Sequence, residues 1–225
     1  VIVGVEKNNI SFLISINQSK HASKIQKIRK QGEIDTIVLD AGHGGKDPGA
    51  IGNNLREKDI TLDIVRQLGL MLERTPGINV VYTRKEDVFI PLWKRTQLAN
   101  TKNGDLFISL HVNSSSHKTV KGYETYLLRI GKADAAIEVA KRENSVITME
   151  QKEHKYRKFD NEEMIVATMT QNADLKSSEI FASLTQNNLE KNIKSNNRGV
   201  KQAGFHVLVG ASMPNVLIEV GFLSN

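Results

Sequence analysis

Short apolar runs alternate with amphipathic segments along residues 34–225. The β-rich run DTIVLDA at 35–41 is followed by a segment at 56–77 in which apolar residues recur at every fourth position from Ile60 to Leu72. The first pattern is typical of a buried strand and the second of an amphipathic helix. The same alternation continues to the end of the chain.

Six further elements follow in the same pattern. The expected strands are INVVYTR (78–84), LFISLHVN (106–113), GYETYLL (122–128), GFHVLVG (204–210) and NVLIEVGF (215–222), and the expected helix is IPLWKRTQLANTKNG (90–104). Strands that alternate with helices predict an α/β fold, here a single domain with a twisted, mostly parallel sheet, helices on both faces and a helical insertion. In such sheets, ligands bind outside the C-terminal ends of the strands.

Two segments depart from the alternation. Residues 1–33 begin with apolar alternation and continue into the polar, Lys-rich stretch NQSKHASKIQKIRKQGE, so we expect an N-terminal extension or linker before the domain at 34–225. Residues 131–178 are charged and mostly helical in propensity, and they stand between two expected strands as a long insertion. Long excursions of this kind are usually functional or mobile.

The composition narrows the chemistry available to the domain. The 225 residues include 39% hydrophobic residues, enough for a substantial core, and no Cys. The absence of Cys excludes disulfides, thiolate metal sites and a Cys nucleophile, so any metal must be held by His and carboxylate side chains. The net charge of +6 suits nucleic acid, a membrane surface or an anionic polymer. The basic residues are dispersed and no nucleic-acid motif is present, which favours a solvated surface without a nucleic-acid partner.

His43 lies directly after the first strand, in a loop that also holds Gly42, Gly44, Gly45 and Gly49. Such glycines permit positive φ angles and close approach of the backbone. The loop matches neither a P-loop nor a dinucleotide-binding fingerprint. Taken alone, a histidine in this position is most simply an ordinary loop residue.

Three other polar residues change the interpretation of His43. His111 and Glu219 stand near the ends of apolar strands, and Glu57 opens the first long helix. Each has a plain structural explanation: a core histidine, a carboxylate paired with a buried Arg, and a first-turn acid favoured by the helix dipole. Together they form a set that a parallel sheet brings to one edge. Two His and one carboxylate with an open position make a catalytic zinc shell, and a further carboxylate can take a proton from water.

Five stretches, in this order, resemble the zinc-dependent N-acetylmuramoyl-L-alanine amidases of the cell-division, amidase_3 type. They are LDAGHGGKDPGA, REKDITL, VYTRKEDVFIPLWKRTQLAN, LFISLHVN and VLIEVGFLSN, and the resemblance covers about residues 34–225. It implies that His43, Glu57 and His111 bind one Zn²⁺ per chain and that Glu219 is the catalytic glutamate. The implied reaction is hydrolysis of the amide bond between N-acetylmuramic acid and L-alanine of the peptidoglycan stem peptide.

Two residues close to the expected ligands suggest supporting roles. We hypothesise that Asp40 and Asn113 orient His43 and His111, because metal-bound histidines commonly bond a neighbouring carboxylate or carbonyl. Arg84 and Arg95 have two interpretations, contact with peptidoglycan carboxylates or packing between a helix and loops, and the second is favoured.

The insertion at 131–178 carries a regulatory hypothesis that comes from the same resemblance. In division-associated members of the family, an inserted helix covers the zinc and a Glu near its start supplies a fourth ligand. The matching stretch is AKRENSVI, which makes Glu143 the candidate inhibitory ligand. The alternative is that Glu143 is one exposed acid among several, with Glu138, Glu150 and Glu153.

The resemblance also implies a partner and a location. We expect peptidoglycan as substrate, an activator protein of the LytM-domain kind, and a periplasmic or cell-envelope location after export. The chain begins with Val1 and shows no signal-peptide pattern, so we expect a mature or shortened form. No stretch approaches the roughly 20 apolar residues that span a bilayer, so no transmembrane segment is expected.

Three other functions compete with this one. A non-catalytic wall-binding module on the same fold would have lost one of the four site residues, and none is lost. A zinc peptidase of similar architecture would cleave plain peptides. A basic nucleic-acid binder would bind DNA in a salt-sensitive way and would have no use for a buried Glu219.

Overall fold

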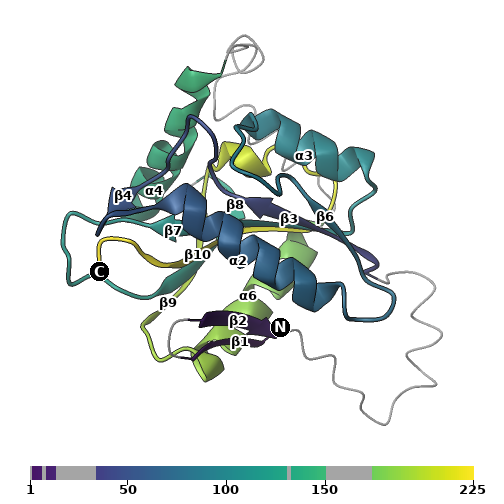
Figure 1. Ribbon diagram of the computed structural model, residues 1–225, viewed down its shortest axis with the longest axis horizontal. Helices are drawn as coiled ribbons and strands as arrows, with labels where there is room; N and C mark the ends of the chain where they lie inside the picture. Colours follow the sequence, from purple (N-terminus) through teal and green to yellow (C-terminus); the bar gives the residue numbers. More distant parts are fainter. Residues whose placement is uncertain (1, 7–8, 14–33, 131–132, 151–173) are drawn as a thin grey trace.

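A six-stranded sheet forms the centre of the protein (Figure 1). The computed structural model describes residues 2–6, 9–13, 34–130, 133–150 and 174–225. The strands of the sheet are β3 (Thr36–Ala41), β6 (Asn79–Tyr82), β7 (Leu106–Asn113), β8 (Tyr123–Leu128), β9 (Asn197–Ala203) and β10 (Asn215–Phe222).

The sheet has the order β6-β3-β7-β10-β8-β9. All neighbouring strands run parallel except β10 and β8, which are antiparallel. The prediction of a mostly parallel sheet is therefore confirmed. The C-terminal ends of β3, β7 and β10 lie at one edge, because these three strands are parallel and adjacent.

Helices cover both faces of the sheet, as predicted (Figure 1). One face packs against α2 (Glu57–Leu72) and α6 (Leu175–Asn192). The other face packs against α3 (Leu92–Thr101), α4 (Asp134–Asn144) and two 3₁₀ helices, η2 (Ser145–Met149) and η4 (His206–Leu208). Each face has its own buried apolar cluster, since successive side chains of a strand point to opposite faces.

The same alternation directs the polar residues of the strands. In β7, Phe107 belongs to the apolar cluster on the α3 and α4 face, and Ser109 and His111 follow it at two-residue intervals. In β10, Leu217 belongs to that cluster and Glu219 follows. His111 and Glu219 are paired in register on adjacent strands. A period of two therefore places both on the face that α4 covers.

One expected strand is wrong. Residues 204–210 (GFHVLVG) form no strand; they contain the 3₁₀ helix η4. The residues from Phe205 to Val209 are all buried, and a short, continuous apolar run does not distinguish a strand from other buried segments. The strand that pairs in parallel with β8 is instead β9, NRGVKQA, which directly precedes this segment. It is an edge strand whose residues are mostly exposed and show little apolar pattern.

The start of α2 is determined by the loop before it. The small hairpin of β4 (Ile51–Gly52) and β5 (Leu55–Arg56) leads directly into the helix. The first backbone N–H groups of the helix, at Glu57 and Lys58, donate to the carbonyl oxygens of Ala50 and Pro48. These bonds satisfy groups that have no partner within a helix, so Glu57 begins the helix without a side-chain cap.

Two predicted segments lie partly outside the described residues. Within 1–33, β1 (Ile2–Glu6) and β2 (Asn9–Leu13) form an antiparallel hairpin, with β1 beside α6 and β2 beside α2. The interpretation of 1–33 as an extension stays a prediction. The predicted insertion at 131–178 contains α4, η2 and the first residues of α6, whereas 151–173 lies outside the described residues. Among the described helices, none has the length and hydropathy required to cross a membrane.

Candidate metal centre

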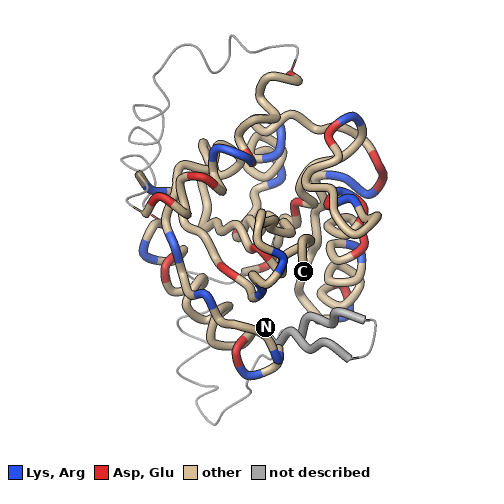
Figure 2. Tube along the Cα trace, turned by 90° about the vertical axis from the view of Figure 1, so that its left-hand side faces the viewer, with Lys and Arg blue, Asp and Glu red and all other residues tan. Residues whose placement is uncertain are grey.

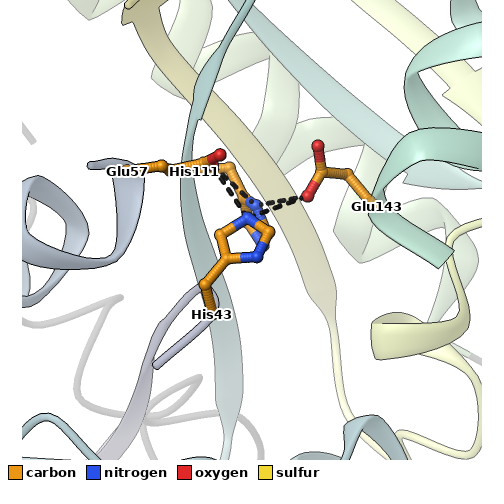
Figure 3. A group of neighbouring side chains, drawn as sticks. All are labelled: His43, Glu57, His111 and Glu143. Atoms are coloured by element: carbon orange, nitrogen blue, oxygen red, sulfur yellow. Dashed lines mark hydrogen bonds and ion pairs between the residues drawn. The ribbon is translucent and has the colours of Figure 1, made fainter. Parts of the chain in front are cut away.

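Four buried side chains from separate elements converge on one point (Figure 3). His43 comes from the loop after β3, Glu57 from the first position of α2, His111 from β7 and Glu143 from the last turn of α4. Their donor atoms all lie within 4.8 Å of one another. The structure therefore brings together the three expected ligands and the expected inhibitory residue.

The spacing between the histidine nitrogens and the carboxylate oxygens is compatible with a single ion bound between them. Glu57 Oε1 lies 3.1 Å from both His43 Nε2 and His111 Nδ1, and Glu143 Oε2 lies 3.0 Å from both. Donors at about 2.0–2.1 Å from a tetrahedral zinc ion lie roughly 3.3 Å apart. His43 Nε2 and Glu143 Oε2 are also buried without a hydrogen-bond partner among the described residues. These atoms are aimed at a shared point, and a donor set of two nitrogens and two oxygens suits zinc among several divalent ions.

Glycines make the room that this convergence needs. A Cβ atom at Gly42 would lie 2.6 Å from the His111 ring, and one at Gly49 would lie 2.6 Å from His43 and 2.7 Å from Glu57. Gly49 has a φ of 65° and His43 itself has a φ of 62°. A left-handed conformation at a non-glycine residue costs roughly 1–2 kcal/mol, so surrounding bonds must hold His43 in place.

Two buried arginines provide those bonds. Arg95 donates to the carbonyl oxygens of Ala41 and His43 at 2.8 and 3.0 Å. Arg84 donates to those of Ala41 and Gly42 at 3.0 and 2.8 Å. Three successive carbonyl groups of the loop are thus fixed by guanidinium groups. Of the two interpretations considered for these arginines, the structure supports packing against the loop.

The hypothesis for Asp40 and Asn113 is wrong as stated. Asp40 accepts hydrogen bonds from Thr83, Ser109 and Arg95 at 2.6, 2.7 and 2.8 Å, not from a ligand histidine. Asp40 therefore supports His43 through Arg95, which donates to both Asp40 and the carbonyl oxygen of His43.

Asn113 also bonds elsewhere. Its Oδ1 accepts from the backbone N–H of Ser114 at 2.7 Å and from Arg142 at 3.0 Å. Asn113 follows His111 by two residues and reaches past the cluster toward α4.

Asp47 is the residue that orients His43, and the sequence analysis missed it. Asp47 Oδ2 lies 2.8 Å from His43 Nδ1, on the ring nitrogen that faces away from the cluster. A carboxylate in this position fixes the orientation and tautomer of a metal-binding histidine. The available signal was an Asp four positions after a histidine in the same glycine-rich loop.

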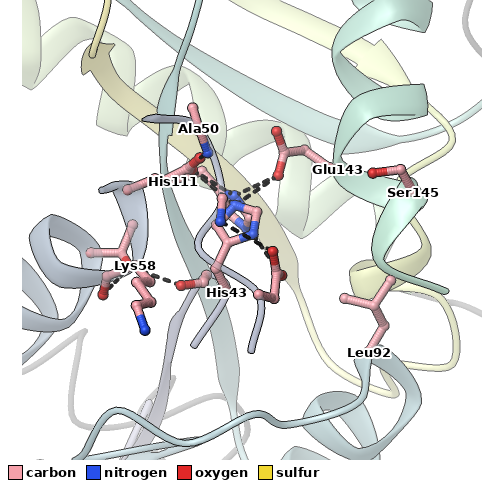
Figure 4. A network of polar contacts seen from close by, with 12 residues as sticks. His43, Ala50, Lys58, Leu92, His111, Glu143 and Ser145 are labelled. Atoms are coloured by element: carbon pink, nitrogen blue, oxygen red, sulfur yellow. Dashed lines mark hydrogen bonds and ion pairs between the residues drawn. The ribbon is translucent and has the colours of Figure 1, made fainter. Parts of the chain in front are cut away.

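Backbone groups hold Glu57, and one of them belongs to Ala50, which is labelled in Figure 4. Its Oε2 accepts from the N–H of Ala50 and its Oε1 from the N–H of Val112, both at 2.8 Å. The carboxylate therefore keeps one orientation relative to β7 and the loop before α2.

The charges of the metal-free cluster stabilise one another. Burial alone would lower the pKa of His111, but Glu143 and Glu57 outweigh it and raise that pKa to about 9. Burial is likewise outweighed at His43, where Glu57 and Asp47 raise the pKa well above its ordinary value. Burial alone would raise the pKa of Glu57, but the charge of His43 and the hydrogen bonds from His111 and His43 together outweigh it and lower that pKa to about 2. Without an ion, protons on the histidines thus take the place of the positive charge that the carboxylates require.

Glu219 lies beside the cluster and is completely buried. Neither of its carboxylate oxygens has a hydrogen-bond partner among the described residues, and the nearest cation is Arg142, with Nη2 3.8 Å from Glu219 Oε1. Burial, and next the charges of Glu143 and Glu57, raise the pKa of Glu219 well above its ordinary value. A buried carboxylate with free oxygens and a raised pKa is suited to accepting and returning a proton.

Two acids of the inserted segment are not surface residues. Glu143 is buried in the cluster, and Glu150 is buried where its Oε1 accepts from the N–H of Leu92 at the start of α3. Glu138 is exposed, as the alternative interpretation expected of all these acids, and Glu153 lies outside the described residues. Along the described chain, Lys and Arg residues are interspersed with Asp and Glu residues (Figure 2).

Comparisons with known proteins identify the family of the chain. The family described as Amidase_3, N-acetylmuramoyl-L-alanine amidase, matches residues 37–225. The N-acetylmuramoyl-L-alanine amidase AmiC of Escherichia coli O6:H1 is 34% identical over 192 residues, which cover 84% of this chain and 46% of AmiC. A putative N-acetylmuramoyl-L-alanine amidase of Buchnera aphidicola (subspecies Baizongia pistaciae) is 34% identical over 191 residues, covering 84% of this chain and 82% of the relative.

Among solved structures, the N-acetylmuramoyl-L-alanine amidase of Clostridium difficile 630 is similar to this chain with a TM-score of 0.62 and 28% identity. The match covers 84% of this chain and 81% of that one. The chain thus spans most of that structure but about half of the length of AmiC.

Proposed function

The chain belongs to the N-acetylmuramoyl-L-alanine amidase family, and from this premise we propose that it hydrolyses the amide bond between N-acetylmuramic acid and L-alanine in peptidoglycan. The single observation that carries the proposal is the buried cluster of His43, Glu57, His111 and Glu143 with Glu219 beside it. The order and spacing of these residues match the motifs expected of the family.

His43, Glu57 and His111 would hold the metal, because their side chains are fixed by the sheet edge and by Asp47, Ala50 and Val112. When bound, a zinc ion polarises the scissile carbonyl, stabilises the developing oxyanion and lowers the pKa of the attacking water. The ligand set is two histidines and one carboxylate, which leaves one position for substrate or water.

Glu219 would move the proton. Its carboxylate lies on β10 beside His111 of β7, and its oxygens have no other hydrogen-bond partner among the described residues. Glu219 accepts the proton of the attacking water and donates it to the nitrogen of the leaving L-alanine. This transfer converts the amine into a good leaving group as the amide bond breaks.

Glu143 would inhibit the enzyme. In the described arrangement, it supplies a fourth donor atom at the position that water or substrate must occupy. Four protein donors make a closed site of the structural kind, whereas a catalytic site keeps one position open. The arrangement corresponds to an inactive state, and displacement of α4 would activate the enzyme.

The partner and location follow from the substrate. We propose that an activator of the LytM-domain kind displaces α4 and that the protein acts in the periplasm or cell envelope, where peptidoglycan lies. The inserted position of α4, between β8 and α6 of the domain, supports a role in regulation rather than in folding of the sheet.

The proposal is tested with the Glu143→Ala variant and purified peptidoglycan sacculi. Mass spectrometry should detect released stem peptides with a free N-terminal L-alanine, and a chelator should abolish the release. The matched control is Glu138→Ala, which removes an exposed acid of the same helix. It should release no more than the unchanged protein.

Two results would contradict the proposal. Release of fragments cut elsewhere, or cleavage of plain peptides that lack the muramic acid, would indicate a zinc peptidase. Binding of the Glu143→Ala variant to sacculi without any release would indicate a non-catalytic wall-binding module.

A further inference from the structure

Three consecutive residues of α4 bind three different parts of the site. Glu143 enters the metal cluster. Arg142, before it, reaches the end of β7, where it donates to Asn113 Oδ1 at 3.0 Å and to the carbonyl oxygen of Ser114 at 3.2 Å. Asn144, after it, donates to the carbonyl oxygen of Gly204 and accepts from the N–H of His206. Polar side chains thus attach the last turn of α4 both to the end of β7 and to the segment that contains Gly204 and His206.

The apolar contacts of α4 are small by comparison. Its buried apolar residues are Ala136, Val139 and Ala140, and the helix begins without a side-chain cap at Ala133. Alanine and valine side chains bury little area, and burial stabilises by about 25 cal/mol per Å². The closed position of α4 therefore depends strongly on the polar bonds of its last turn.

Arg142 differs from Asn144 because it also approaches Glu219, the proposed base. Its Nη2 lies 3.8 Å from Glu219 Oε1, while its Nε donates to Glu143 Oε1 at 3.1 Å. The same guanidinium therefore faces both the inhibitory carboxylate and the proton-accepting carboxylate. The oxygens of Glu219 have no hydrogen-bond partner among the described residues, and 3.8 Å is too long for a hydrogen bond, so Arg142 acts on Glu219 through its positive charge.

We propose that Arg142 is a second inhibitory group of α4. Arg142 pairs with Glu219 and restrains this carboxylate, while Glu143 supplies the fourth donor atom of the metal centre. This inference rests on the proposed function, because it assigns a regulatory contact to the same site. Displacement of α4 then frees the open metal position and the base in one movement. Removal of Glu143 alone frees only the metal position and leaves the base paired with Arg142.

The proposal is tested by adding a second substitution to Glu143→Ala. With equal zinc content, Arg142→Gln/Glu143→Ala should release stem peptides from sacculi about fivefold faster than Glu143→Ala alone, the gain expected from removal of one modest ion pair. Glutamine keeps polar groups near Asn113 and Ser114 but removes the positive charge from Glu219.

The matched control is Lys141→Gln/Glu143→Ala. Lys141 is the neighbouring cation of the same helix, but it is exposed and pairs with Glu138. This control should be no faster than Glu143→Ala. If the Arg142 variant is no faster than this control, or is slower than Glu143→Ala, Arg142 only positions Glu143 or assists the reaction, and the proposal is wrong.

A second measurement does not depend on activity. Thermal unfolding of the zinc-loaded protein is compared among Arg142→Gln, Glu219→Gln and the double variant, all with Glu143 in place. If Arg142 and Glu219 interact, the shift in the unfolding midpoint of the double variant should differ from the sum of the single shifts by about 2–4 °C. Additive shifts would overturn the proposal whatever the activity. Coupled shifts without hydrolysis by any variant would overturn the proposed function and leave the contact established.

Discussion

The donors of the metal cluster belong to two regions that are held in different ways. His43, Glu57 and His111 come from the sheet edge and the start of α2, and backbone N–H groups and Asp47 fix their side chains. Glu143 comes from α4, whose apolar face is small and whose last turn is attached by single polar side chains. We call the first region, with its donors His43, Glu57 and His111, the frame, because it is built on the central sheet. The second region is helix α4, which lies over the frame.

Under the proposed function, this difference suits each region to a separate role. A metal site that must bind zinc at all times needs donors held in one geometry, and the frame provides three. A donor that must leave when the enzyme is activated needs a support that can be displaced without unfolding the sheet. Helix α4 meets that need, because it contributes no strand to the sheet and little apolar burial to the core.

The largest expected effect concerns Glu219, where the two regions meet. Glu219→Gln in the Glu143→Ala protein should reduce the release of stem peptides by about 10²–10⁴-fold, the usual contribution of a general base. The zinc content should stay unchanged, because Glu219 contributes no donor atom to the cluster. Zinc analysis and a release assay on the same sample check both statements. Loss of zinc together with activity would place Glu219 in the frame and contradict its role as the base.

The next largest effect tests the frame. Gly42→Ala places a Cβ atom 2.6 Å from the His111 ring, so the ring must move. The zinc affinity, measured by competition with a chelator, should fall by about 10–100-fold, as for other disturbances of ligand orientation. The matched control is Gly221→Ala, where a Cβ would meet nothing within 4 Å. Equal affinities for the two variants would mean that the frame tolerates displacement of a ligand.

A smaller effect concerns pH. The pKa of His111 is raised from an ordinary 6.5 to about 9 in the folded, metal-free protein. The protonated His111 therefore stabilises the folded state. This contribution is complete below pH 6.5 and is lost as the pH rises through about 9. The free energy of unfolding of the metal-free protein should fall across that window by about 3 kcal/mol, at roughly 1.4 kcal/mol per pH unit.

The pH prediction has an acidic counterpart and a control. The pKa of Glu57 is lowered to about 2, so its stabilisation is present above its ordinary value of 4.5 and is lost as the pH falls toward 2. Urea unfolding of the metal-free protein from pH 5 to 9 measures the fall in unfolding free energy that is expected from His111. The zinc-loaded protein should show no such fall, since its histidines bind metal instead of protons. A metal-free protein of constant stability over this range would contradict the ion pairing in the cluster.

The smallest effect tests how α4 is retained. Asn144→Ala removes the bonds to Gly204 and His206 without touching the cluster. Loss of about 1 kcal/mol should raise the basal release of stem peptides about fivefold by favouring displacement of α4. The control is Asn188→Ala, a half-buried residue of α6 whose side chain bonds only its own helix in the described contacts. No increase over this control would mean that apolar packing, not the polar bonds, retains α4.

The elements with clear periodicity could be predicted from the sequence. The expected strands at 106–113 and 215–222 agree with β7 and β10 in both bounds, because each is an apolar run completely or mostly buried in the sheet. The strand at 197–203 was missed, since an edge strand is buried on too few positions to leave a pattern. The strand expected at 204–210 was wrong, since burial on all sides of η4 imitates a central strand.

The candidate site shows the same limit. His43, Glu57, His111 and Glu219 could be identified because each is a polar residue in an apolar or glycine-rich context. Their convergence follows from parallel strand ends meeting at one edge. The supporting bonds could not be assigned, because they depend on side-chain directions. Asp40 points to Arg95 instead of a ligand, and Asp47 lies on the distal nitrogen of His43.

The central claim is that Glu143 is a displaceable fourth donor beside three fixed ones. The most direct test is the visible absorption spectrum of the Co²⁺-substituted protein, with and without azide, for the unchanged chain, Glu143→Ala and Glu138→Ala. The account predicts that azide changes the spectrum of Glu143→Ala alone, because only this variant has an open position on the metal. Equal responses of all three proteins to azide, or none in Glu143→Ala, would contradict it.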